Sequence, residues 1–306
     1  LIDIYGIDHG INEKNPGFPS VPGSALYLTI DSKLQFFIES LFNDKTGSVI
    51  CMNPLNGEVL AYLSSPDYDL NSFVGPVPIE IWESWNKDKK RPLLNRVIQG
   101  LYPPGSTMKI IAAALALENN IVDSYWEIKC DGEYKLGDRI FHCWNERGHN
   151  NVNMKKAIKE SCNIYFYHLM QKLSFEDWAG MAIDFGFGSK TNLDLYGEKR
   201  GLIPNRKYMN KKYGRYGWAQ GNLLTFVIGQ GDILATPLQV VQMMNLIAGG
   251  GLSFEPKLNT KNISKKIEVS LSSETLYFLQ NSLWEVVNGT NGTGSLANVE
   301  GGEVYG

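Results

Sequence analysis

The segment YPPGSTMK at residues 102–109, followed by the apolar run IIAAALAL at residues 110–117, organises the whole chain. Two prolines and a glycine do not fit inside a helix, whereas the run after them consists of strong helix formers. The segment therefore predicts a helix that begins near Ser106. Residues three apart share a helix face, so we expect Lys109 Nζ within hydrogen-bond reach of Ser106 Oγ. This pair is a candidate nucleophile with its base.

The chemistry of a serine–lysine pair explains why these two residue types matter. A serine hydroxyl is a poor nucleophile until a neighbour takes its proton, and a lysine does so when burial or nearby cations lower its pKa. Partial positive charge at a helix start also favours a developing alkoxide. The same spacing fits an N-cap Ser106 beside a solvated Lys109, so this motif alone leaves both readings open.

Length and composition predict one large domain, or one domain with an appendage. The chain has 306 residues, 43% of them hydrophobic and seven of them tryptophan, which is enough to bury a sizeable core. The formal net charge of −3 gives no electrostatic case for nucleic acid as a partner. No apolar run approaches the roughly 20 residues that a membrane helix needs.

The order of sequence patterns predicts a connector followed by a domain. Residues 1–24 are rich in Pro and Gly and show no periodicity, so we expect a connector or the remnant of a preceding region, with the domain at residues 25–306. A helix is expected after Asp31, and a hairpin around the Pro- and Asn-Gly-containing turn at residues 53–57. Prolines and a charged cluster predict irregular surface structure at residues 64–100.

The second half of the chain contains further helical patterns and one unusual mixture. Helical segments are expected near residues 154–160, 164–173, 237–248 and 276–289. Residues 205–221 combine five basic residues with Tyr208, Tyr213, Tyr216 and Trp218. Such a mixture can bind an extended polymer, but it more often covers a surface loop, and we predict a loop.

A second polar motif, Ser161-Cys162-Asn163, lies between two helical segments. Residues two apart do not share a helix face, so Ser161 and Asn163 can both point into one site only from a turn. A helix cap is the alternative for this tripeptide alone. Its position after the Ser106 motif favours a shared pocket.

Together these motifs carry a resemblance to a known family. Ser-x-x-Lys at Ser106 to Lys109, followed by Ser-x-Asn at Ser161 to Asn163, resembles the penicillin-recognising serine acyltransferases, which include penicillin-binding proteins and serine β-lactamases. The segments LNR (94–96), YPPGS (102–106), SCNIYFY (161–167) and IGQG through ATPLQ (228–239) are similar to elongation-type class B penicillin-binding proteins. The resemblance extends over residues 26–306.

The resemblance implies an α/β transpeptidase fold with an antiparallel sheet flanked by helices. It also implies peptidoglycan D,D-transpeptidase activity, in which Ser106 attacks the carbonyl between the two terminal D-alanines of a stem peptide. Lys109 would deprotonate Ser106, Ser161 would relay the proton to the leaving amine, and Asn163 would bind the substrate amide. An amine from a neighbouring strand would resolve the acyl-enzyme, and β-lactams would trap Ser106.

The resemblance further implies where such a protein works and with what. We expect a removed N-terminal membrane helix and pedestal, and a location at the periplasmic, extracytoplasmic face of the inner membrane. A SEDS-type glycan polymerase and the elongation complex are the expected partners. No cofactor is expected for catalysis.

One family motif does not follow the other two in this sequence. The family carries Lys-Thr/Ser-Gly on a strand that lines the site; the one such triplet here, Lys45-Thr46-Gly47, precedes Ser106, and none follows Asn163, so we expect a domain that lacks its C-terminal strands. That strand would supply one of two oxyanion donors, whose loss costs about 10²–10³ in rate. The chain as given is therefore predicted to be impaired.

The cysteines predict a metal site beside the second motif. Cys130, Cys143, His149 and Cys162 match the ligand set of a closed tetrahedral zinc site, and related elongation-type proteins resemble this chain in placing metal ligands there. Such a zinc ion would hold Ser161 and Asn163 from behind and play a structural role. The alternatives are a Cys130–Cys143 disulfide with Cys162 free, or His142 in place of His149.

Two other functions compete with the transpeptidase. A serine β-lactamase would need a base that activates water for deacylation, and no residue is assigned to that role. A non-catalytic penicillin sensor or scaffold would not depend on the Ser106 hydroxyl.

Overall fold

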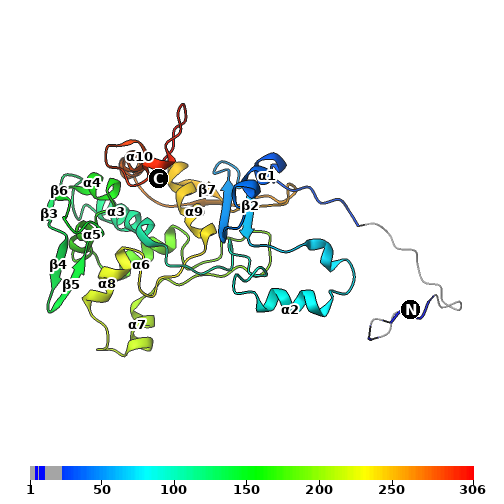
Figure 1. The fold of residues 1–306 in the computed structure, drawn as a ribbon. Coiled ribbons are helices and arrows are strands. Elements are labelled where there is room, and N and C mark those ends of the chain that lie inside the picture. Colours follow the sequence, from blue (N-terminus) through cyan, green and yellow to red (C-terminus); the bar gives the residue numbers. More distant parts are fainter. Residues whose placement is uncertain (1–3, 6, 11–22) are drawn as a thin grey trace.

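The computed structural model describes residues 4–5, 7–10 and 23–306 (Figure 1). Most of the expected connector at residues 1–24 lies outside these residues, so the boundary at residue 24 stays a prediction. Among the described residues, no helix has both the length and the apolar character that crossing a membrane requires.

Helices and short antiparallel strand pairs alternate along the described chain. The α-helices are α1 (Ser32–Leu41), α2 (Ile79–Lys87), α3 (Lys109–Glu118), α4 (Met154–Lys159), α5 (Asn163–Met170), α6 (Phe175–Asp184), α7 (Arg206–Tyr213), α8 (Gln220–Val227), α9 (Pro237–Ala248) and α10 (Ser273–Asn288). The 3₁₀ helices are η1 (Leu70–Phe73), η2 (Gly105–Met108) and η3 (Ser295–Ala297). The strands are β1 (Gly47–Met52), β2 (Val59–Ser65), β3 (Ile128–Cys130), β4 (Glu133–Leu136), β5 (Arg139–His142), β6 (Asn150–Val152), β7 (Leu252–Phe254) and β8 (Lys266–Glu268). They pair as β1–β2, β3–β6, β4–β5 and β7–β8, all antiparallel.

The β1–β2 hairpin lies between α1 and α9. Ala61 and Leu63 are buried in the cluster that contains Ile38 of α1. Successive side chains of a strand point to opposite faces, and Tyr62, between these two, packs against the cluster that contains Leu238 of α9. The hairpin predicted from the Asn-Gly turn is confirmed, and the antiparallel strands flanked by helices agree with the predicted α/β class.

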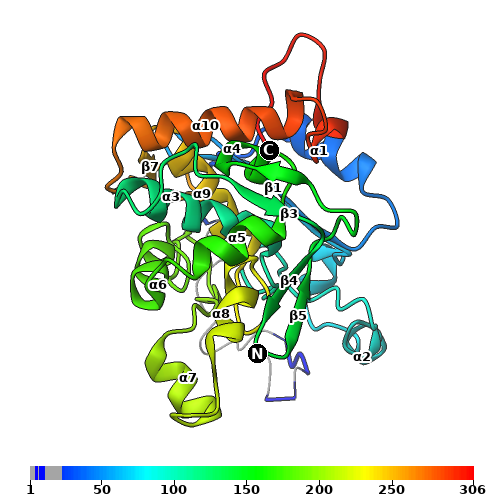
Figure 2. The same ribbon diagram turned by 90° about the vertical axis from the view of Figure 1, so that its left-hand side faces the viewer.

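The main core surrounds α3, which the Ala-rich run forms as predicted. Every residue from 110 to 116 is buried, and α3 packs against α5, α6 and α10 (Figure 2). Small alanine side chains allow neighbouring helices to approach a helix that has no polar face. The first turn of the predicted helix is the 3₁₀ helix η2, which carries Ser106.

Two segments predicted as irregular or loop structure contain helices. Residues 64–100 include η1 and α2, and the rings of Tyr68, Phe73 and Trp85 stabilise them by packing together at centroid distances of 5.2–5.7 Å. Residues 205–221 include α7, where the Asn205 side chain caps the helix and Met209 is fully buried. In both cases clustered apolar side chains outweigh the loop-like composition.

Candidate active site

The segment that carries Ser106 is held by residues from much later in the chain. Tyr102 and Ala235 exchange two backbone hydrogen bonds of 2.9 Å, and the Gly105 N–H donates to the Gly229 carbonyl oxygen at 3.0 Å. A Cβ atom at Gly229 would lie 2.0 Å from the Gly105 carbonyl oxygen, and Gly229 has a φ of +68°. Only glycine permits this approach, so Gly229 fixes the position of the turn before Ser106.

Ser161 and Asn163 reach the same place from the turn between α4 and α5. Ser161 adopts a left-handed conformation with a φ of +52°, and the next residue, Cys162, is the N-cap of α5. The Ser161 hydroxyl donates to Ser106 Oγ at 3.0 Å. The turn that the sequence required for a shared pocket is therefore present.

Lys109 is 2% exposed and lies under this turn. Its Nζ donates to the Ser161 carbonyl oxygen at 2.8 Å, to Ser161 Oγ at 2.9 Å and to Asn163 Oδ1 at 2.8 Å. The expected direct hydrogen bond between Lys109 and Ser106 is not formed. The buried amine instead points to the three acceptors of the α4–α5 turn, and Ser161 Oγ connects it to Ser106.

Burial also prepares Lys109 for proton transfer. Loss of hydration lowers the pKa of the Lys109 amine to about 8, although the nearby Cys162 and Cys143 thiols act in the opposite direction. With that pKa, roughly one molecule in ten carries a neutral Lys109 at pH 7. A neutral amine can accept the Ser106 proton through the Ser161 hydroxyl.

The exposed Ser106 opens onto a cleft of about 550 Å³. Its walls come from the turn before α3, the loop after β5, the α4–α5 turn, the α8–α9 connection and the C-terminal segment. The lining residues are Gly105, Ser106, Trp144, Ser161, Asn163, Ile228, Gln230 and Thr293. The site therefore combines an accessible nucleophile with a base that solvent hardly reaches.

Trp144 is a site residue that sequence reasoning missed. Its indole N–H is shared between the Glu160 and Ser161 carbonyl oxygens, both at 3.1 Å, and its ring is 59% exposed at the edge of the cleft. The same Ser161 carbonyl accepts the Lys109 ammonium. Nothing in the sequence signals this role, except that Trp144 directly follows a predicted metal ligand.

The structure brings together Cys130, Cys143, His149 and Cys162 behind the α4–α5 turn. All four are buried, and their ligand atoms lie within 4.8 Å of one another. His149 Nδ1 lies 3.6 Å from Cys130 Sγ and 3.5 Å from Cys143 Sγ. Ligand atoms of a tetrahedral zinc site, with bonds of about 2.0–2.3 Å, lie about 3.3–3.8 Å apart, so this donor set fits the metal.

Neither alternative arrangement is formed in this structure. All four cysteines are free thiols, so Cys130 and Cys143 form no disulfide. His142 is exposed and lies 3.7 Å from Glu133, outside the cluster. Cys51 packs separately beneath α1, and burial raises the pKa of its thiol, as expected for an unreactive cysteine.

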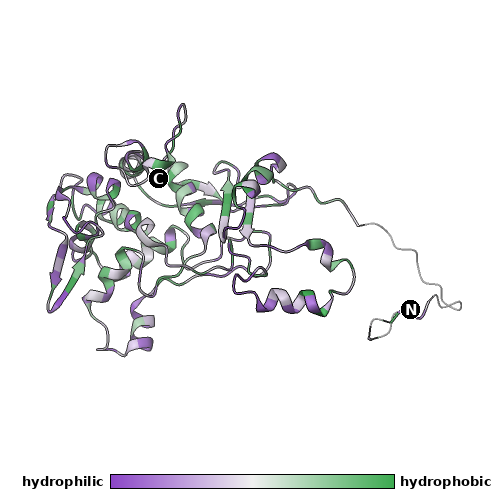
Figure 3. Ribbon diagram, viewed as in Figure 1, coloured by the Kyte–Doolittle hydropathy of each residue, from purple (hydrophilic) through white to green (hydrophobic). Residues whose placement is uncertain are grey.

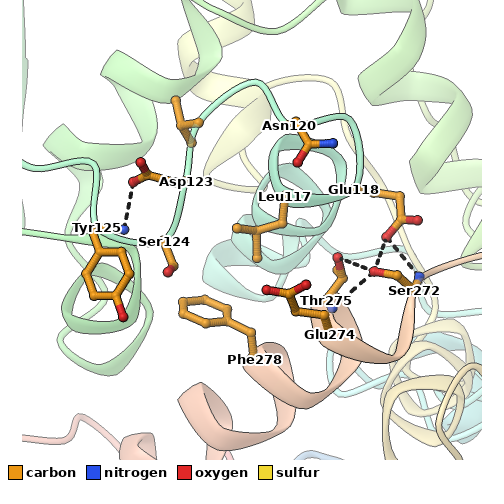
Figure 4. A pocket seen from close by; sticks show the side chains of 11 residues that line it. Leu117, Glu118, Asn120, Asp123, Ser124, Tyr125, Ser272, Glu274, Thr275 and Phe278 are labelled. Atoms are coloured by element: carbon orange, nitrogen blue, oxygen red, sulfur yellow. Dashed lines mark hydrogen bonds between the residues drawn. The ribbon is translucent and has the colours of Figure 1, made fainter.

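A second cavity, of about 520 Å³, lies at the opposite end of α3 (Figure 4). The Glu118 carboxylate accepts hydrogen bonds from the backbone and hydroxyl of Ser272 at 2.9 Å and so holds the start of α10. Asp123 accepts from the Tyr125 N–H. These carboxylates have structural partners, and none of the predicted catalytic or metal residues lines this cavity.

The chain is similar to known proteins over most of its length. The family model "Penicillin binding protein transpeptidase domain" matches residues 47–306. The peptidoglycan D,D-transpeptidase MrdA of Haemophilus influenzae is 33% identical over 297 residues, which cover 91% of this chain and 45% of that protein. The chain thus spans less than half the length of this curated relative.

Solved structures show the same similarity. Penicillin-binding protein PBP2 from Helicobacter pylori superposes with a TM-score of 0.87 at 34% identity, covering 92% of this chain and 53% of that one. The complex between PBP2 and MreC from the same organism gives a TM-score of 0.84 at 36% identity, covering 88% of this chain and 51% of that one.

Proposed function

The chain belongs to the penicillin-binding protein transpeptidase family, and we propose that it is the catalytic domain of an elongation-type peptidoglycan D,D-transpeptidase. The observation that carries this proposal is the connected path from Ser106 Oγ through Ser161 Oγ to the buried Lys109 Nζ, with steps of 3.0 and 2.9 Å. The path starts in an open cleft, where a peptide can reach the nucleophile.

In the acylation step, Ser106 Oγ attacks the carbonyl carbon between the two terminal D-alanines of a stem peptide. The Ser106 proton passes to Ser161, whose own proton passes to the neutral Lys109 amine. When the tetrahedral intermediate collapses, the C–N bond breaks, Ser161 gives one proton to the leaving D-alanine nitrogen, and Lys109 returns its proton to Ser161. The product is an ester on Ser106.

Asn163 has the free donor that substrate binding requires. Its Oδ1 accepts from Lys109 at 2.8 Å, and its Nδ2 donates to the His142 carbonyl oxygen at 3.3 Å. A side-chain amide carries two N–H donors, so one remains for a substrate carbonyl in the cleft. An amine from a neighbouring strand then attacks the ester, and Ser106 Oγ leaves and regains its proton.

The lining of the cleft favours the transpeptidase over a serine β-lactamase. The eight described residues that line it include no Asp or Glu that could activate water for deacylation. Incubation with a fluorescent penicillin tests the proposal: a covalent label should persist on the wild type for many minutes and be absent from Ser106→Ala. Rapid hydrolysis of a chromogenic cephalosporin would instead identify a β-lactamase.

A penicillin sensor or scaffold would also retain the label, so a second measurement is needed. Release of D-alanine from a pentapeptide, followed by mass spectrometry of the product formed with an acceptor amine, distinguishes the enzyme from the sensor. The impaired rate predicted because no Lys-Thr/Ser-Gly triplet follows Asn163 stays a prediction. An acylation rate constant typical of penicillin-binding proteins, measured on these 306 residues, would contradict it.

We further propose that Cys130, Cys143, Cys162 and His149 hold a structural zinc ion. The hydrogen bond from the Cys162 thiol lowers the pKa of the Cys143 thiol, whereas burial raises the pKa of Cys130 and the same hydrogen bond raises that of Cys162, so a bound zinc ion would have to displace the protons of these two thiols. Four protein ligands leave no open position, so the ion would fix the chain on either side of Ser161 and take no part in the reaction. Zinc analysis and thiol counting before and after chelation test this proposal.

The partners and location remain proposals drawn from the relatives. The structure of H. pylori PBP2 is described in complex with MreC, and we propose an MreC-type partner, a SEDS-type polymerase and an extracytoplasmic location for this protein. Pull-down of an MreC-type protein by the chain tests the first of these partners.

A further inference from the structure

Basic residues gather in one stretch of an otherwise acidic protein. The formal net charge of the chain is −3, yet no Asp or Glu occurs between Glu198 and Asp232. The same stretch contains seven cationic residues, namely Lys199, Arg200, Arg206, Lys207, Lys211, Lys212 and Arg215. Five of these seven lie on α7 or in the turn that follows it, where Figure 3 shows a mostly hydrophilic helix.

Two of these cations anchor α7 to the domain. Arg206 pairs with Glu176 at 2.5 Å, and Lys212 pairs with Asp232 at 2.6 Å. The fully buried Met209 lies between them in sequence and joins the main core. The inner side of α7 is therefore fixed and electrically balanced.

The remaining cations of α7 have no counter-ion among the described residues. Lys207 and Lys211 are exposed and lie one helical turn apart, an arrangement in which like charges repel. Arg215 is exposed beyond the end of the helix and lies over the Tyr216 ring at 5.7 Å. An anionic ligand would relieve this repulsion.

Exposed aromatic rings lie among these charges. Tyr216 is 90% exposed and Tyr213 is 38% exposed, and the Tyr213 hydroxyl donates to Asp232 at 2.7 Å, which orients its ring. An aromatic face offers apolar area on which the C–H face of a sugar ring can stack. Cations interleaved with such rings fit a polymer that carries both carboxylates and sugars.

This surface is less suited to a membrane. Helices that lie on membranes present an apolar face of Trp, Phe or Leu to the lipid. The buried apolar residue of α7 is Met209, which faces the core, and the outward side carries Lys207 and Lys211. Charge alone would attract anionic lipid, but α7 has no outward apolar face to insert.

The surface is linked to the cleft by a short segment of chain. α7 leads through a turn into α8, and Ile228 and Gln230, directly after α8, line the cleft that contains Ser106. Asp232, the partner of Lys212, lies two residues beyond Gln230. Figures 1 and 2 show α7 projecting from the same side of the molecule as α8.

We infer that Lys207, Lys211, Tyr213, Arg215 and Tyr216, hereafter the α7 surface, form a docking site for the glycan–peptide strand that presents the substrate. This inference rests on the proposed transpeptidase function. Carboxylates of the stem peptides pair with the three free cations, and sugar rings stack on the tyrosines. The strand is thereby held while its peptide enters the cleft.

The test measures binding of the 306-residue chain to purified peptidoglycan sacculi freed of attached protein and anionic polymers. The triple variant Lys207→Glu/Lys211→Glu/Arg215→Glu should bind about tenfold more weakly, because three exposed ion pairs each contribute a fraction of a kcal/mol. The wild-type affinity should fall with added salt, and that dependence should be smaller in the variant. Tyr216→Ala should weaken binding without changing the salt dependence.

A matched control separates the effect of the α7 surface on binding from the effect of the net charge of the chain. Lys261→Glu/Lys265→Glu/Lys266→Glu makes the same change in net charge at exposed lysines before and at the start of β8. The control should bind sacculi like the wild type, and both triple variants should melt like the wild type and react with fluorescent penicillin at the wild-type rate. Equal loss of sacculus binding in both triple variants, or no loss in the α7 variant, would overturn the inference.

Two further outcomes identify a different partner or a failed premise. Wild-type binding to phosphatidylglycerol vesicles but not to sacculi, abolished by the α7 variant, would assign the surface to a membrane and overturn the inference. If the wild type binds sacculi through α7 but takes up no penicillin label even over many hours, which exceeds the predicted slowing, the docking surface stands and the proposed catalysis fails.

Discussion

Ser161 Oγ lies 3.0 Å from Ser106 Oγ, so the serine of the second motif is the direct neighbour of the nucleophile. The base that the sequence predicts for Ser106 is one step further away, because Lys109 Nζ donates to Ser161 Oγ at 2.9 Å. The two hydroxyls and the amine form a hydrogen-bonded chain. In the proposed mechanism, proton transfer from Ser106 therefore depends on Ser161.

Removal of the middle hydroxyl should stop the relay. Ser161→Ala is expected to lower the acylation rate constant with fluorescent penicillin by about 10²–10⁴, the usual contribution of a positioned acid–base group. Ser84→Ala, at an exposed hydroxyl of α2, is the control and should react like the wild type. A rate within threefold of the wild type for Ser161→Ala would show that Lys109 acts on Ser106 without Ser161.

The pH dependence of acylation should follow Lys109. Burial lowers the pKa of this amine from its ordinary 10.5 to about 8, so the amine is protonated, and unable to accept a proton, below that pH. The acylation rate constant should therefore rise with pH and level off above about pH 8, falling about tenfold for each pH unit below it. A stopped-flow profile from pH 6 to 10 checks this, and a rate that does not change with pH would argue against a lysine base.

The same pKa makes a prediction about stability, with the sign fixed by linkage. The folded-state pKa of Lys109 is lower than its unfolded value, so the unfolded chain binds more protons between about pH 8 and 10.5. The contribution of Lys109 to the free energy of unfolding should rise with pH across that window. Denaturant titrations of the wild type and Lys109→Met at pH 8 and 10 measure it, since the variant lacks this term.

Trp144→Phe should show whether Trp144 positions Ser161 or helps to bind penicillin. The variant keeps an aromatic ring at the cleft but loses the N–H that the Ser161 and Glu160 carbonyls accept. Loss of one such hydrogen bond should lower the acylation rate constant about two- to tenfold, with little change in the dissociation constant for penicillin. Trp284→Phe on α10 is the control. An unchanged rate constant in Trp144→Phe would show that the indole N–H of Trp144 does not contribute to acylation.

Gly229 should tolerate no side chain. Gly229→Ala would place a methyl group 2.0 Å from the Gly105 carbonyl oxygen at a φ of +68°, and the turn before Ser106 would have to move. We expect a loss of about 1–3 kcal/mol in the free energy of unfolding and a large loss of acylation. Gly250→Ala is the matched control, because Gly250 has a φ of +67° and no atom within 4 Å of the new methyl. Equal losses of stability and acylation in both variants would mean that they arise from the strain of a positive φ and not from the contact with the Gly105 carbonyl oxygen.

If the proposed zinc ion is bound, its removal should loosen the α4–α5 turn. Treatment with a strong chelator is expected to lower both the melting temperature and the acylation rate, and added zinc should restore both. Cys162→Ser should behave like the chelated protein, whereas Cys51→Ser, at a cysteine outside the cluster, should behave like the wild type. Full activity after complete loss of zinc would contradict the structural role.

The sequence predicts well the elements that residues close in the chain determine. Helix α3 follows from a Pro-Pro-Gly lead-in and a run of helix formers, and the turn at Ser161 follows from the spacing of two polar residues. The elongation-type family resemblance, which rests on short motifs, is confirmed by the match over residues 47–306 and by the relatives.

What the sequence does not predict depends on contacts between distant segments. Lys109 turns toward acceptors more than fifty positions later in the chain, so its spacing from Ser106 could not reveal its partner. Trp144, just after β5, approaches Ser161, just before α5, because β5 packs against α5. Helices α2 and α7 form although their composition is typical of loops, since buried or clustered side chains compensate for it.

The left-handed backbone of Ser161 has an evolutionary consequence. A side chain in this conformation costs about 1 kcal/mol relative to glycine, whereas glycine would lose both the hydroxyl that touches Ser106 and the acceptor of a hydrogen bond from the buried Lys109. Backbone strain alone therefore favours glycine at this position, and the hydrogen bonds of the hydroxyl oppose it. A relative that carries glycine here is expected to have lost the connection between its nucleophile and its lysine.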